Sequence, residues 1–355
     1  MHKVIKGWFF LPAVLLLCLG IVESCSDYIP PPKVDKTELW KGISSSISLL
    51  TTSSEGAAGG NYALGSQATL IIAITTAQIV YADAAATQET VTTGVNNLNT
   101  AVNTYKSKVI PDIDPANLVA QYTFDQIGTT AYGAAVHDYS GNGRTASLGV
   151  GHSLWGKGVP TLGTDRYGTD ATALHFDKGA NIEIPYIADF NPPNLSISLW
   201  VKSDVNSPIV NNQFLVSLNR KRGYELRLDD SPKAIFSVNT AENPGNYITE
   251  SFNSILTQAI WRHLVVTFGG GHMKFYVNGA LVKDAPHDGT LLKQAIPINL
   301  ILGQDLPTKR YSTDPSSPNY VNNGGYFIGT MDEVRIYKSV LTLDQIMSIY
   351  TIEKP

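Results

Sequence analysis

The chain of 355 residues has only two cysteines, and charged residues make up only 16% of it. Two cysteines exclude a disulfide-dense scaffold and a zinc site with several cysteine ligands. The 26 lysines and arginines are fewer than the 30 aspartates and glutamates, and the resulting net charge of −4 gives no basic surface for nucleic acid. The hydrophobic fraction of 43% excludes a disordered acidic chain and is enough for one large core and a smaller unit.

The first residues have the order of a signal peptide. Lys3 and Lys6 precede an almost wholly apolar run over residues 8–22, which is too short to span a membrane comfortably. Cys25 stands shortly after this run, and three prolines at 30–32 stiffen the chain beyond it. The segment resembles a bacterial lipoprotein signal, which implies cleavage before Cys25 and acylation of this cysteine. The alternative is an ordinary secretory signal with an incidental cysteine.

Cleavage after residue 24 would remove two lysines and one glutamate, so that the net charge of −4 would become −5. Two or more acyl chains on Cys25 would hold the protein stably on a membrane, where a single chain would be marginal. We therefore expect an outer-membrane lipoprotein of a Gram-negative bacterium that faces the cell surface or the periplasm. Residues 25–35 are then the tether between the lipid and the first folded unit.

Residues 36–108 have apolar positions every three or four residues, which is typical of amphipathic helices. The three stripes consist of Leu39, Ile43, Ile47 and Leu50; of Leu70, Ala73, Ile74, Ala77 and Tyr81; and of Val91, Val95, Leu98, Val102 and Tyr105. Because no helix can bury its own stripe, the pattern predicts a small three-helix bundle. The segment, with Gly60-Asn61-Tyr62 before its second helix, resembles the FIVAR-like modules of bacterial surface proteins. We interpret it as a spacer, and a binding role is the alternative.

A linker at 109–117, with two prolines that disfavour helix before them, precedes a change of period. Over residues 118–350 the apolar residues alternate in short β-rich runs, which glycine, proline, asparagine and aspartate separate. This pattern predicts an antiparallel β-sandwich of the jelly-roll type. Near the end, Thr342 and Gln345 have the spacing of a capping box, so we expect a terminal helix after Thr342. The predicted fold class is a multidomain α and β protein, with the three-helix bundle before the sandwich.

Several segments of the predicted sandwich resemble the laminin-G-like, concanavalin A-like domain of bacterial secreted proteins. They are Tyr-Thr-Phe-Asp at 122–125, Asp-Tyr-Ser-Gly-Asn-Gly at 138–143, Ala-Leu-His-Phe at 173–176, Ser-Leu-Trp-Val-Lys at 198–202, residues 261–268, residues 275–279 and residues 329–337. Their order matches that family across the whole of 118–350. The resemblance implies the jelly-roll fold. It leaves the function open, because the family includes glycan-binding modules and adhesion domains, and related jelly rolls include glycoside hydrolases.

The closest approach to a hydrolase motif is Glu-Leu-Arg-Leu-Asp-Asp at 225–230. The jelly-roll glucanases that the fold resembles carry Glu-x-Asp-x-x-Glu on one strand, where alternation sends the first carboxylates to one face. Here Arg227 stands at the position where the glucanase motif has its second carboxylate, which assists the other two. Its guanidinium would hold Glu225 and Asp229 in their ionised forms. A general acid needs a raised pKa. The sequence therefore predicts no enzyme and favours a polar strand face with cross-strand pairing.

A structural calcium ion is the one metal that the sequence suggests. Asp332 shares the parity of Val334 and Ile336, so it is predicted to point inward, where a carboxylate needs a hydrogen bond or a cation. Asp138 and Asn142 lie in a glycine-rich turn with carbonyl oxygens, which are hard donors. In related sandwiches the aspartate of such a terminal motif helps to hold calcium, which implies a Ca²⁺ site of Asp138, Asn142 and Asp332. The alternative is that Asp332 caps a turn and Asp138 forms an Asx-turn.

Two segments are candidates for ligand binding. Trp155 lies in a predicted loop and could stack on a sugar ring or plug one end of the sandwich. Residues 305–325 have no strand pattern, and a loop of this length inside a compact domain is usually functional or disordered. The loop carries Arg310, Tyr311 and Tyr320, whose rings and guanidinium suit the hydroxyls and C–H faces of carbohydrate. The same composition is also ordinary for a solvated loop.

The leading hypothesis is a membrane-anchored, non-catalytic lipoprotein in which a helical spacer presents a lectin-like sandwich to an extracellular polysaccharide or other glycan. It rests on the order of signal, spacer and sandwich, and on the interrupted carboxylate motif. A second hypothesis is a protein-adhesion module that holds another surface protein in a complex. A third is a divergent glycoside hydrolase, which would depend on Glu225.

Overall fold

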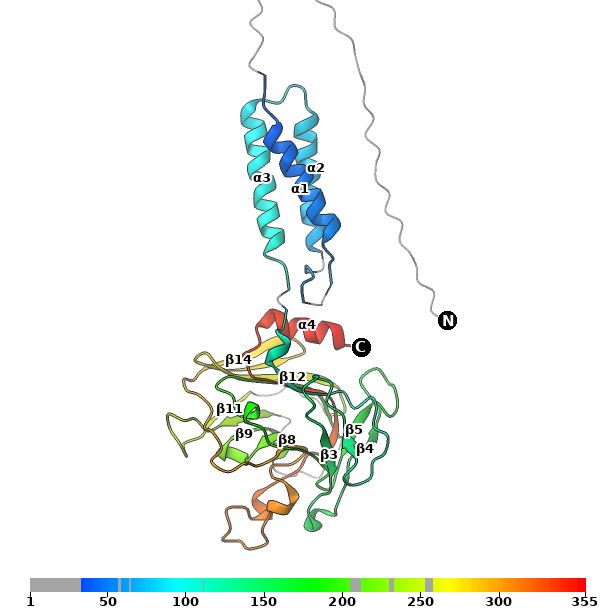
Figure 1. Cartoon of the computed structure of the whole chain (residues 1–355), viewed down its shortest axis with the longest axis vertical. Coiled ribbons are helices and arrows are strands. Elements are labelled where there is room, and N and C mark those ends of the chain that lie inside the picture. Colours follow the sequence, from blue (N-terminus) through cyan, green and yellow to red (C-terminus); the bar gives the residue numbers. More distant parts are fainter. Residues whose placement is uncertain are drawn as a thin grey trace, which may run out of the picture.

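The computed structural model describes residues 33–56, 59–63, 65–110, 112–204, 212–229, 233–252 and 258–355. The predicted signal, Cys25 and most of the tether lie outside the described residues, so lipidation stays a prediction. None of the helices in the described ranges combines the length and the apolar character needed to cross a bilayer. A helical unit and a β-sandwich follow one another along the chain (Figure 1).

The helical unit consists of α1 (Thr37–Thr52), α2 (Ser66–Ala82) and α3 (Gln88–Lys106), which confirms the three predicted helices. Their shared core contains Leu39, Ile43, Leu70, Ile74, Ala77, Val91, Leu98 and Tyr105. These residues come from all three predicted stripes and occupy consecutive turns, because residues three or four apart lie on one face of a helix. Two positions of the predicted stripes, Ile47 and Tyr81, are exposed at the surface.

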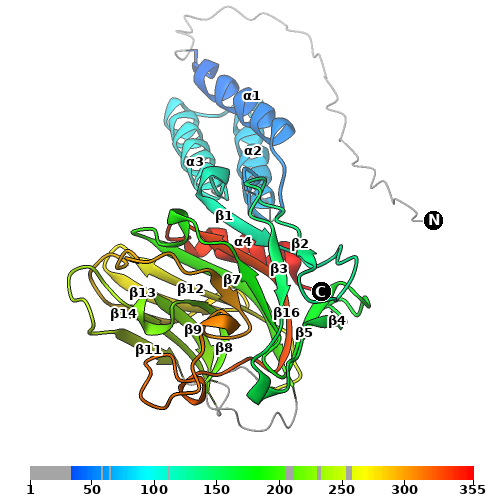
Figure 2. The ribbon, with the colours of Figure 1, turned by 60° about the horizontal axis from the view of Figure 1, so that its bottom comes forward.

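The sandwich consists of two antiparallel sheets of eight strands each in the described part of the chain. The first sheet has the order β14-β13-β12-β7-β16-β5-β4, and β1 pairs with β16. The second has the order β11-β10-β9-β8-β15-β6-β3-β2. Neighbours in space are often distant in sequence, as when β7 pairs with both β12 and β16. This arrangement confirms the predicted fold class, a three-helix unit followed by an antiparallel jelly-roll sandwich (Figure 2).

The strands are short, and their bounds follow the alternating runs of the sequence. In the first sheet they are β1 (Leu118–Tyr122), β4 (Thr161–Gly163), β5 (Ala173–Phe176), β7 (Leu195–Ser203), β12 (Arg262–Gly269), β13 (His272–Val277), β14 (Ala280–Pro286) and β16 (Gly329–Tyr337). In the second sheet they are β2 (Ala135–Val136), β3 (Ala146–Gly149), β6 (Asn181–Ile184), β8 (Gln213–Leu218), β9 (Tyr224–Leu228), β10 (Ala234–Val238), β11 (Ile248–Phe252) and β15 (Leu300–Leu302). The main core lies between the sheets and includes Leu199, Phe236 and Phe275, which are fully buried.

A β-bulge in β16 corrects one prediction from the alternating pattern. Met331, Val334 and Ile336 all belong to the core between the sheets, so the alternation slips by one residue between them. The slip lies at Glu333, which has a φ of +52°, and the pairing with β7 shifts between Asp332 and Arg335. The prediction that Asp332 points into the core is therefore wrong. An extra residue in a strand turns the following side chains to the other face.

The terminal helix α4 (Leu343–Glu353) begins with the predicted capping box, in which Thr342 and Gln345 exchange side-chain-to-backbone hydrogen bonds. The helix covers part of the outer face of the first sheet, where Tyr350 stacks against Trp200 with ring centroids 5.9 Å apart. It lies between the helical unit and the sandwich (Figure 1), and Gln345 Nε2 donates a hydrogen bond of 3.0 Å to the Asp112 carbonyl.

Candidate binding site

The outer face of the second sheet has a pocket of about 270 Å³ over β8 and β9. Its lining consists of Asn212, Phe214, Arg220, Arg222, Glu225, Arg227, Tyr247, Pro318 and Asn323. The strands contribute the floor, the short helix η4 (Arg220–Arg222) contributes one side, and the 305–325 loop contributes another. This loop is the orange segment beside β8 and β9 in Figure 2. Arginine, tyrosine and amide side chains thus converge on one concave surface.

A larger space of about 380 Å³ lies where the helical unit meets α4. Its lining is mostly backbone turns and small or aliphatic side chains, and no aromatic ring is among the described residues around it. Ligand sites usually combine apolar or aromatic surface with a few convergent polar groups. The arginine-rich pocket fits this description better, so we take it as the candidate site.

The strand β9 positions Glu225 and Arg227 at the floor of the pocket. Tyr224, Leu226 and Leu228 point into the core, so alternation places the two residues between them on the opposite face. Arg227 Nε lies 3.2 Å from Glu225 Oε1, and Arg227 Nη1 donates a hydrogen bond of 2.5 Å to Asn212 Oδ1. The predicted contact between the guanidinium and Glu225 is therefore present.

This contact decides what the pocket can do chemically. Glu225 is only 2% exposed, and it is the one acidic residue among the described residues that line the pocket. Hydrolysis of a glycosidic bond by the usual mechanism needs two carboxyl groups on either side of the sugar. A single carboxylate held by an arginine does not supply this pair, whereas the same groups can bind hydroxyls.

The 305–325 loop is attached to the strands through the buried carboxylate of Asp305. Asp305 is fully buried and forms an ion pair with Arg220 Nε, and its other oxygen accepts a hydrogen bond from the Tyr311 hydroxyl. Burial raises the pKa of Asp305, while Arg220 and Tyr311 act in the opposite direction. A Cβ at Gly324 would lie 2.7 Å from Asp305 Oδ1, so glycine allows the loop to approach this closely. Arg220 also donates to the carbonyl of Pro318 at 2.9 Å, which fixes that wall of the pocket.

Arg222 and Tyr247 lie at the mouth of the pocket. Arg222 is exposed, and its Nη1 lies 3.4 Å from Asn319 Oδ1. Tyr247, immediately before β11, is 42% exposed and belongs to the lining of the same pocket. An aromatic ring can cover the C–H face of a sugar, while guanidinium and amide groups donate to its oxygens.

The structure places the four predicted ligand residues near this pocket but outside its lining. Trp155, in η2 (Ser153–Trp155), packs edge-on against Tyr311 with centroids 4.9 Å apart. Arg310 is exposed at the end of η5 (Thr308–Arg310). Tyr320 offers its carbonyl to Arg220 at 3.4 Å. The loop therefore lines the pocket through Pro318 and Asn323 instead, and ligand contacts of the four predicted residues stay a prediction.

Sequence reasoning missed Arg220, Arg222 and Tyr247. The basic run Asn-Arg-Lys-Arg-Gly at 219–223, between two strand patterns, is a local signal that could have pointed to η4. Tyr247 had no such signal. It reaches the pocket because β11 pairs with β10 and β10 with β9, which brings the start of β11 beside η4.

The side chains of the predicted calcium site already form hydrogen bonds or ion pairs within the protein. Asp138 Oδ1 accepts hydrogen bonds from the backbone N–H groups of Gln121 and Ser140, both at 2.9 Å, and Oδ2 accepts from Ser140 Oγ at 2.8 Å and from the Arg144 N–H at 2.7 Å. Burial alone would raise the pKa of Asp138, but these hydrogen bonds lower it. Asn142 Nδ2 donates to the backbone of β1. This is the Asx-turn alternative, since the carboxylate organises its own turn.

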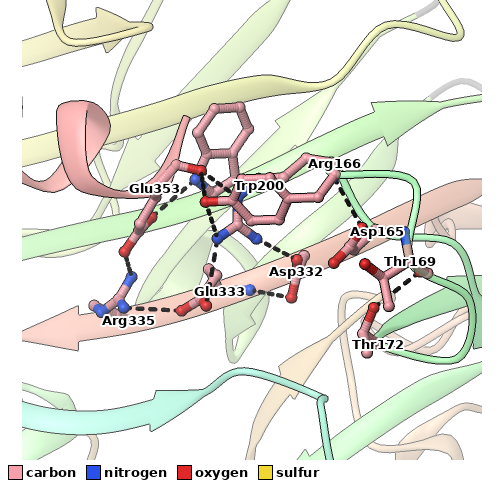
Figure 3. Close-up of polar contacts among 10 residues, drawn as sticks. Asp165, Arg166, Thr169, Thr172, Trp200, Asp332, Glu333, Arg335 and Glu353 are labelled. Carbon is pink, nitrogen blue, oxygen red and sulfur yellow. Dashed lines mark hydrogen bonds and ion pairs between the residues drawn. The ribbon is translucent and has the colours of Figure 1, made fainter. Parts of the chain in front are cut away.

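Asp332 belongs to a second polar cluster, which lies beneath α4 on the outer face of the first sheet (Figure 3). Arg166 Nη1 lies 2.5 Å from Asp332 Oδ2 and Arg166 Nη2 lies 3.6 Å from Glu333 Oε1. Arg335 pairs with Glu333 at 2.8 Å and also with Glu353 at the end of α4. Burial raises the pKa of Asp332 to about 8, although Arg166 opposes the rise. Three carboxylates share two guanidiniums here, so full ionisation would leave one negative charge without a partner.

These contacts do not fit a calcium site formed by Asp138, Asn142 and Asp332. The cation that faces Asp332 is Arg166, and the oxygens of Asp138 already accept four hydrogen bonds. Within the described ranges no group of three or more His, Cys, Asp or Glu side chains has a spacing that could hold a metal ion. Calcium binding by the protein stays a prediction.

Residues 176–347 match the family model described as the Concanavalin A-like lectin/glucanases superfamily, of the laminin G type. These residues therefore carry a concanavalin A-like jelly-roll domain, which agrees with the strand order of the sandwich. No curated protein sequence matches the chain.

Three solved structures are similar to the sandwich at low sequence identity. One is domain 4 of AbnA, an extracellular GH43 arabinanase from Geobacillus stearothermophilus, in complex with arabinotriose. It has a TM-score of 0.46 and 18% identity, and the match covers 66% of this chain and 98% of that domain. The botulinum neurotoxin type G receptor binding domain has a TM-score of 0.45 and 14% identity over 67% of this chain. The binding domain of Paraclostridial Mosquitocidal Protein 1 has a TM-score of 0.46 and 15% identity over 66%. This chain covers 51% and 52% of the two toxin domains.

Proposed function

We propose that the protein is a non-catalytic binding protein whose β-sandwich holds a glycan in the pocket over β8 and β9. One observation carries the proposal: the exposed ring of Tyr247, the guanidinium of Arg222 and the amide of Asn323 converge on one concave surface. Sugar rings offer C–H faces to aromatic side chains and hydroxyls to polar ones, so this combination suits a saccharide.

The absence of catalysis is part of the proposal. Arg227 donates a hydrogen bond to the carboxylate of Glu225. Among the described residues that line the pocket, no second carboxyl group is present to act together with Glu225. Binding needs neither a nucleophile nor a general acid, and the same groups then serve as fixed hydrogen-bonding partners. The matched family model includes both lectins and glucanases by its description, so the site rather than the family supports this choice.

The proposal also includes an anchor and a spacer. The apolar run at 8–22 and Cys25 have the order of a lipoprotein signal, which would attach the chain to the outer membrane. The described chain enters α1 at the end of the helical unit that is far from the sandwich (Figure 1). The helices would then stand between the membrane and the binding domain, as a spacer does.

A glycan array followed by affinity electrophoresis of the full chain tests the binding function. We expect retention by at least one polysaccharide and a loss of retention in Tyr247→Ala, because the ring at the pocket mouth is removed. The matched control is Tyr132→Ala, an exposed tyrosine of the sandwich outside the pocket lining. Equal retention of both variants would place binding elsewhere. A blank array would contradict the proposal and favour the adhesion alternative, which co-purification from intact membranes would test.

A further inference from the structure

We infer that the glycan is an anionic saccharide whose acidic group is bound by Arg222 at the mouth of the pocket. A uronic acid carboxylate is the group that fits this position. The inference rests on the proposed function, because it names the class of ligand that the same pocket takes. It depends on how the charges of the lining residues are already paired.

Three arginines line the pocket, and two of them are neutralised by buried carboxylates. Arg227 pairs with Glu225 at 3.2 Å, and Arg220 forms an ion pair with Asp305, which lies behind the pocket and is fully buried. Arg222 has no ion pair among the described residues, and its guanidinium has one polar contact there, the 3.4 Å contact with Asn319 Oδ1. The lining therefore has one positive charge for which the described protein supplies no counterion.

The position of this charge favours a ligand rather than solvent alone. Arg220 and Arg227 are held by their partners, so the wall and floor around Arg222 are already ordered. A guanidinium presents parallel N–H groups that match the two oxygens of a carboxylate. Because the whole chain has a net charge of −4, this cationic pocket stands out from its surroundings and would attract an anion locally.

The remaining lining residues indicate a sugar and not a small free anion. Phe214 lies at the floor and Tyr247 at the mouth, and both rings line the same pocket of about 270 Å³. An inorganic anion would leave these rings and most of this volume without a contact. An acidic sugar would place its ring against Tyr247 and its carboxylate on Arg222.

The experiment compares one polymer before and after removal of its charge. The full chain is titrated with polygalacturonate, with the same polymer after chemical reduction of its carboxyl groups, and with a sulfated galactan. The variants are Arg222→Gln, which keeps an amide but removes the charge, and Arg222→Lys. The control Lys157→Gln removes one exposed positive charge outside the pocket lining. Tyr247→Ala reports on the pocket itself.

We expect polygalacturonate to bind and its reduced form to bind at least about tenfold more weakly, because the charge-assisted hydrogen bonds are lost. Arg222→Gln should weaken polygalacturonate binding by a similar factor, Arg222→Lys by less, and Lys157→Gln should have little effect. Added salt should weaken the wild-type complex.

The other outcomes separate the two proposals. Equal binding of the native and reduced polymers, with loss in Tyr247→Ala, would overturn the anionic ligand and leave the glycan pocket intact. Binding of the sulfated galactan alone would keep an anionic ligand and overturn the carboxylate assignment. Binding that is unaffected by both Tyr247→Ala and Arg222→Gln, or no binding to any polymer, would overturn the inference together with the proposed site.

Discussion

At the scale of single residues, buried carboxyl groups in this protein lie against arginine side chains. Asp332 faces Arg166 beneath α4, and Asp305 faces Arg220 under the 305–325 loop. A charge that leaves water for the protein interior is tolerated when an opposite charge and hydrogen bonds replace its hydration. Removal of one member of such a pair therefore lowers the free energy of unfolding by more than the intact pair contributes to it.

Arg166→Met tests this statement beneath α4. The change leaves the buried carboxylates of Asp332 and Glu333 without their shared guanidinium, so we expect the free energy of unfolding to fall by about 3–5 kcal/mol. Urea denaturation measures the loss. In the control, Lys338→Met, a partly exposed ion pair with Asp189 is removed, and a loss of no more than about 1 kcal/mol is expected. Similar small losses in both variants would show that the buried network contributes no more than a surface pair.

His263 predicts a pH dependence of stability. It is fully buried, its Nε2 lies 2.8 Å from Ser198 Oγ, and burial lowers its pKa to about 3, with further lowering by Arg335 and Arg166. The unfolded chain binds a proton on this histidine near its ordinary pKa of about 6.5, whereas the folded protein does not. Its contribution to stability is therefore complete above pH 6.5 and decreases as the pH falls toward 3.

The measurement is the difference in unfolding free energy between the wild type and His263→Gln, because other groups titrate in the same range. We expect this difference to decrease by about 1.4 kcal/mol for each pH unit below 6.5. The exposed His137, changed to Gln in the same way, is the control. A difference that stays constant from pH 7 to pH 5 would contradict a buried neutral His263.

At the scale of elements, the 305–325 loop is a fixed wall rather than a free surface loop. Asp305 accepts from Tyr311 and pairs with Arg220, while Ser217 Oγ on β8 donates to the Asp305 carbonyl at 2.8 Å. The Asp305 carboxylate thus holds Tyr311 and Arg220, while the backbone carbonyl of the same residue ties the start of the loop to β8. A change at Asp305 should affect both stability and the ligand.

Asp305→Asn removes the charge and keeps the shape of the side chain. Because Arg220 then has no counterion at this buried position, we expect a loss of about 3 kcal/mol in stability and weaker glycan binding. Limited proteolysis should cut the loop faster in this variant. Asp314→Asn is the control in the same loop, since Asp314 is exposed and its carboxylate accepts hydrogen bonds only from Ser316 among the described residues. Unchanged proteolysis in Asp305→Asn would show that the wall is held by other contacts.

The elements also show what local sequence patterns determine. The helical stripes and the capping box at Thr342 were predictable because their residues lie within a few turns of one another. Alternation predicted Val334 and Ile336 in the core correctly, but it failed at Asp332, because the bulge at Glu333 depends on the pairing of β16 with β7. Pairing across a sheet is not visible in one strand.

The pocket was less predictable than the fold for the same physical reason. The contact of Arg227 with Glu225 follows from alternation on a single strand. Arg222, Tyr247 and Asn323 come together only through the turn after β8, the pairing of β11 and the ion pair that fixes the loop. The sequence also does not show that Arg166 lies against Asp332, because the two residues are far apart along the chain.

At the scale of the whole molecule, α4 lies in space between the helical unit and the sandwich, although it is the last element of the chain (Figure 1). The described chain starts at the far end of the helical unit, and the 305–325 loop lies at the opposite end of the molecule. α3 has 19 residues, which corresponds to a length of about 28 Å at 1.5 Å per residue. An anchor before residue 33 would therefore place the pocket well away from the membrane surface.

Cys25→Ala tests the anchor independently of the ligand. If Cys25 is acylated, the wild-type protein should incorporate a clickable palmitate analogue and sediment with membranes. The variant should incorporate none and appear in the soluble fraction. The pocket variant Tyr247→Ala serves as the control, because it should be labelled like the wild type. Equal labelling of Cys25→Ala would contradict acylation at this cysteine.

The most direct test of the central claim is a crystal structure of the full chain with the oligosaccharide that binds most tightly. The account predicts a sugar ring against Tyr247 over β8 and β9, with its acidic group within hydrogen-bonding distance of Arg222. A sugar bound elsewhere, such as beside Trp155 or in the space between the helical unit and α4, with the pocket over β8 and β9 empty, would contradict it.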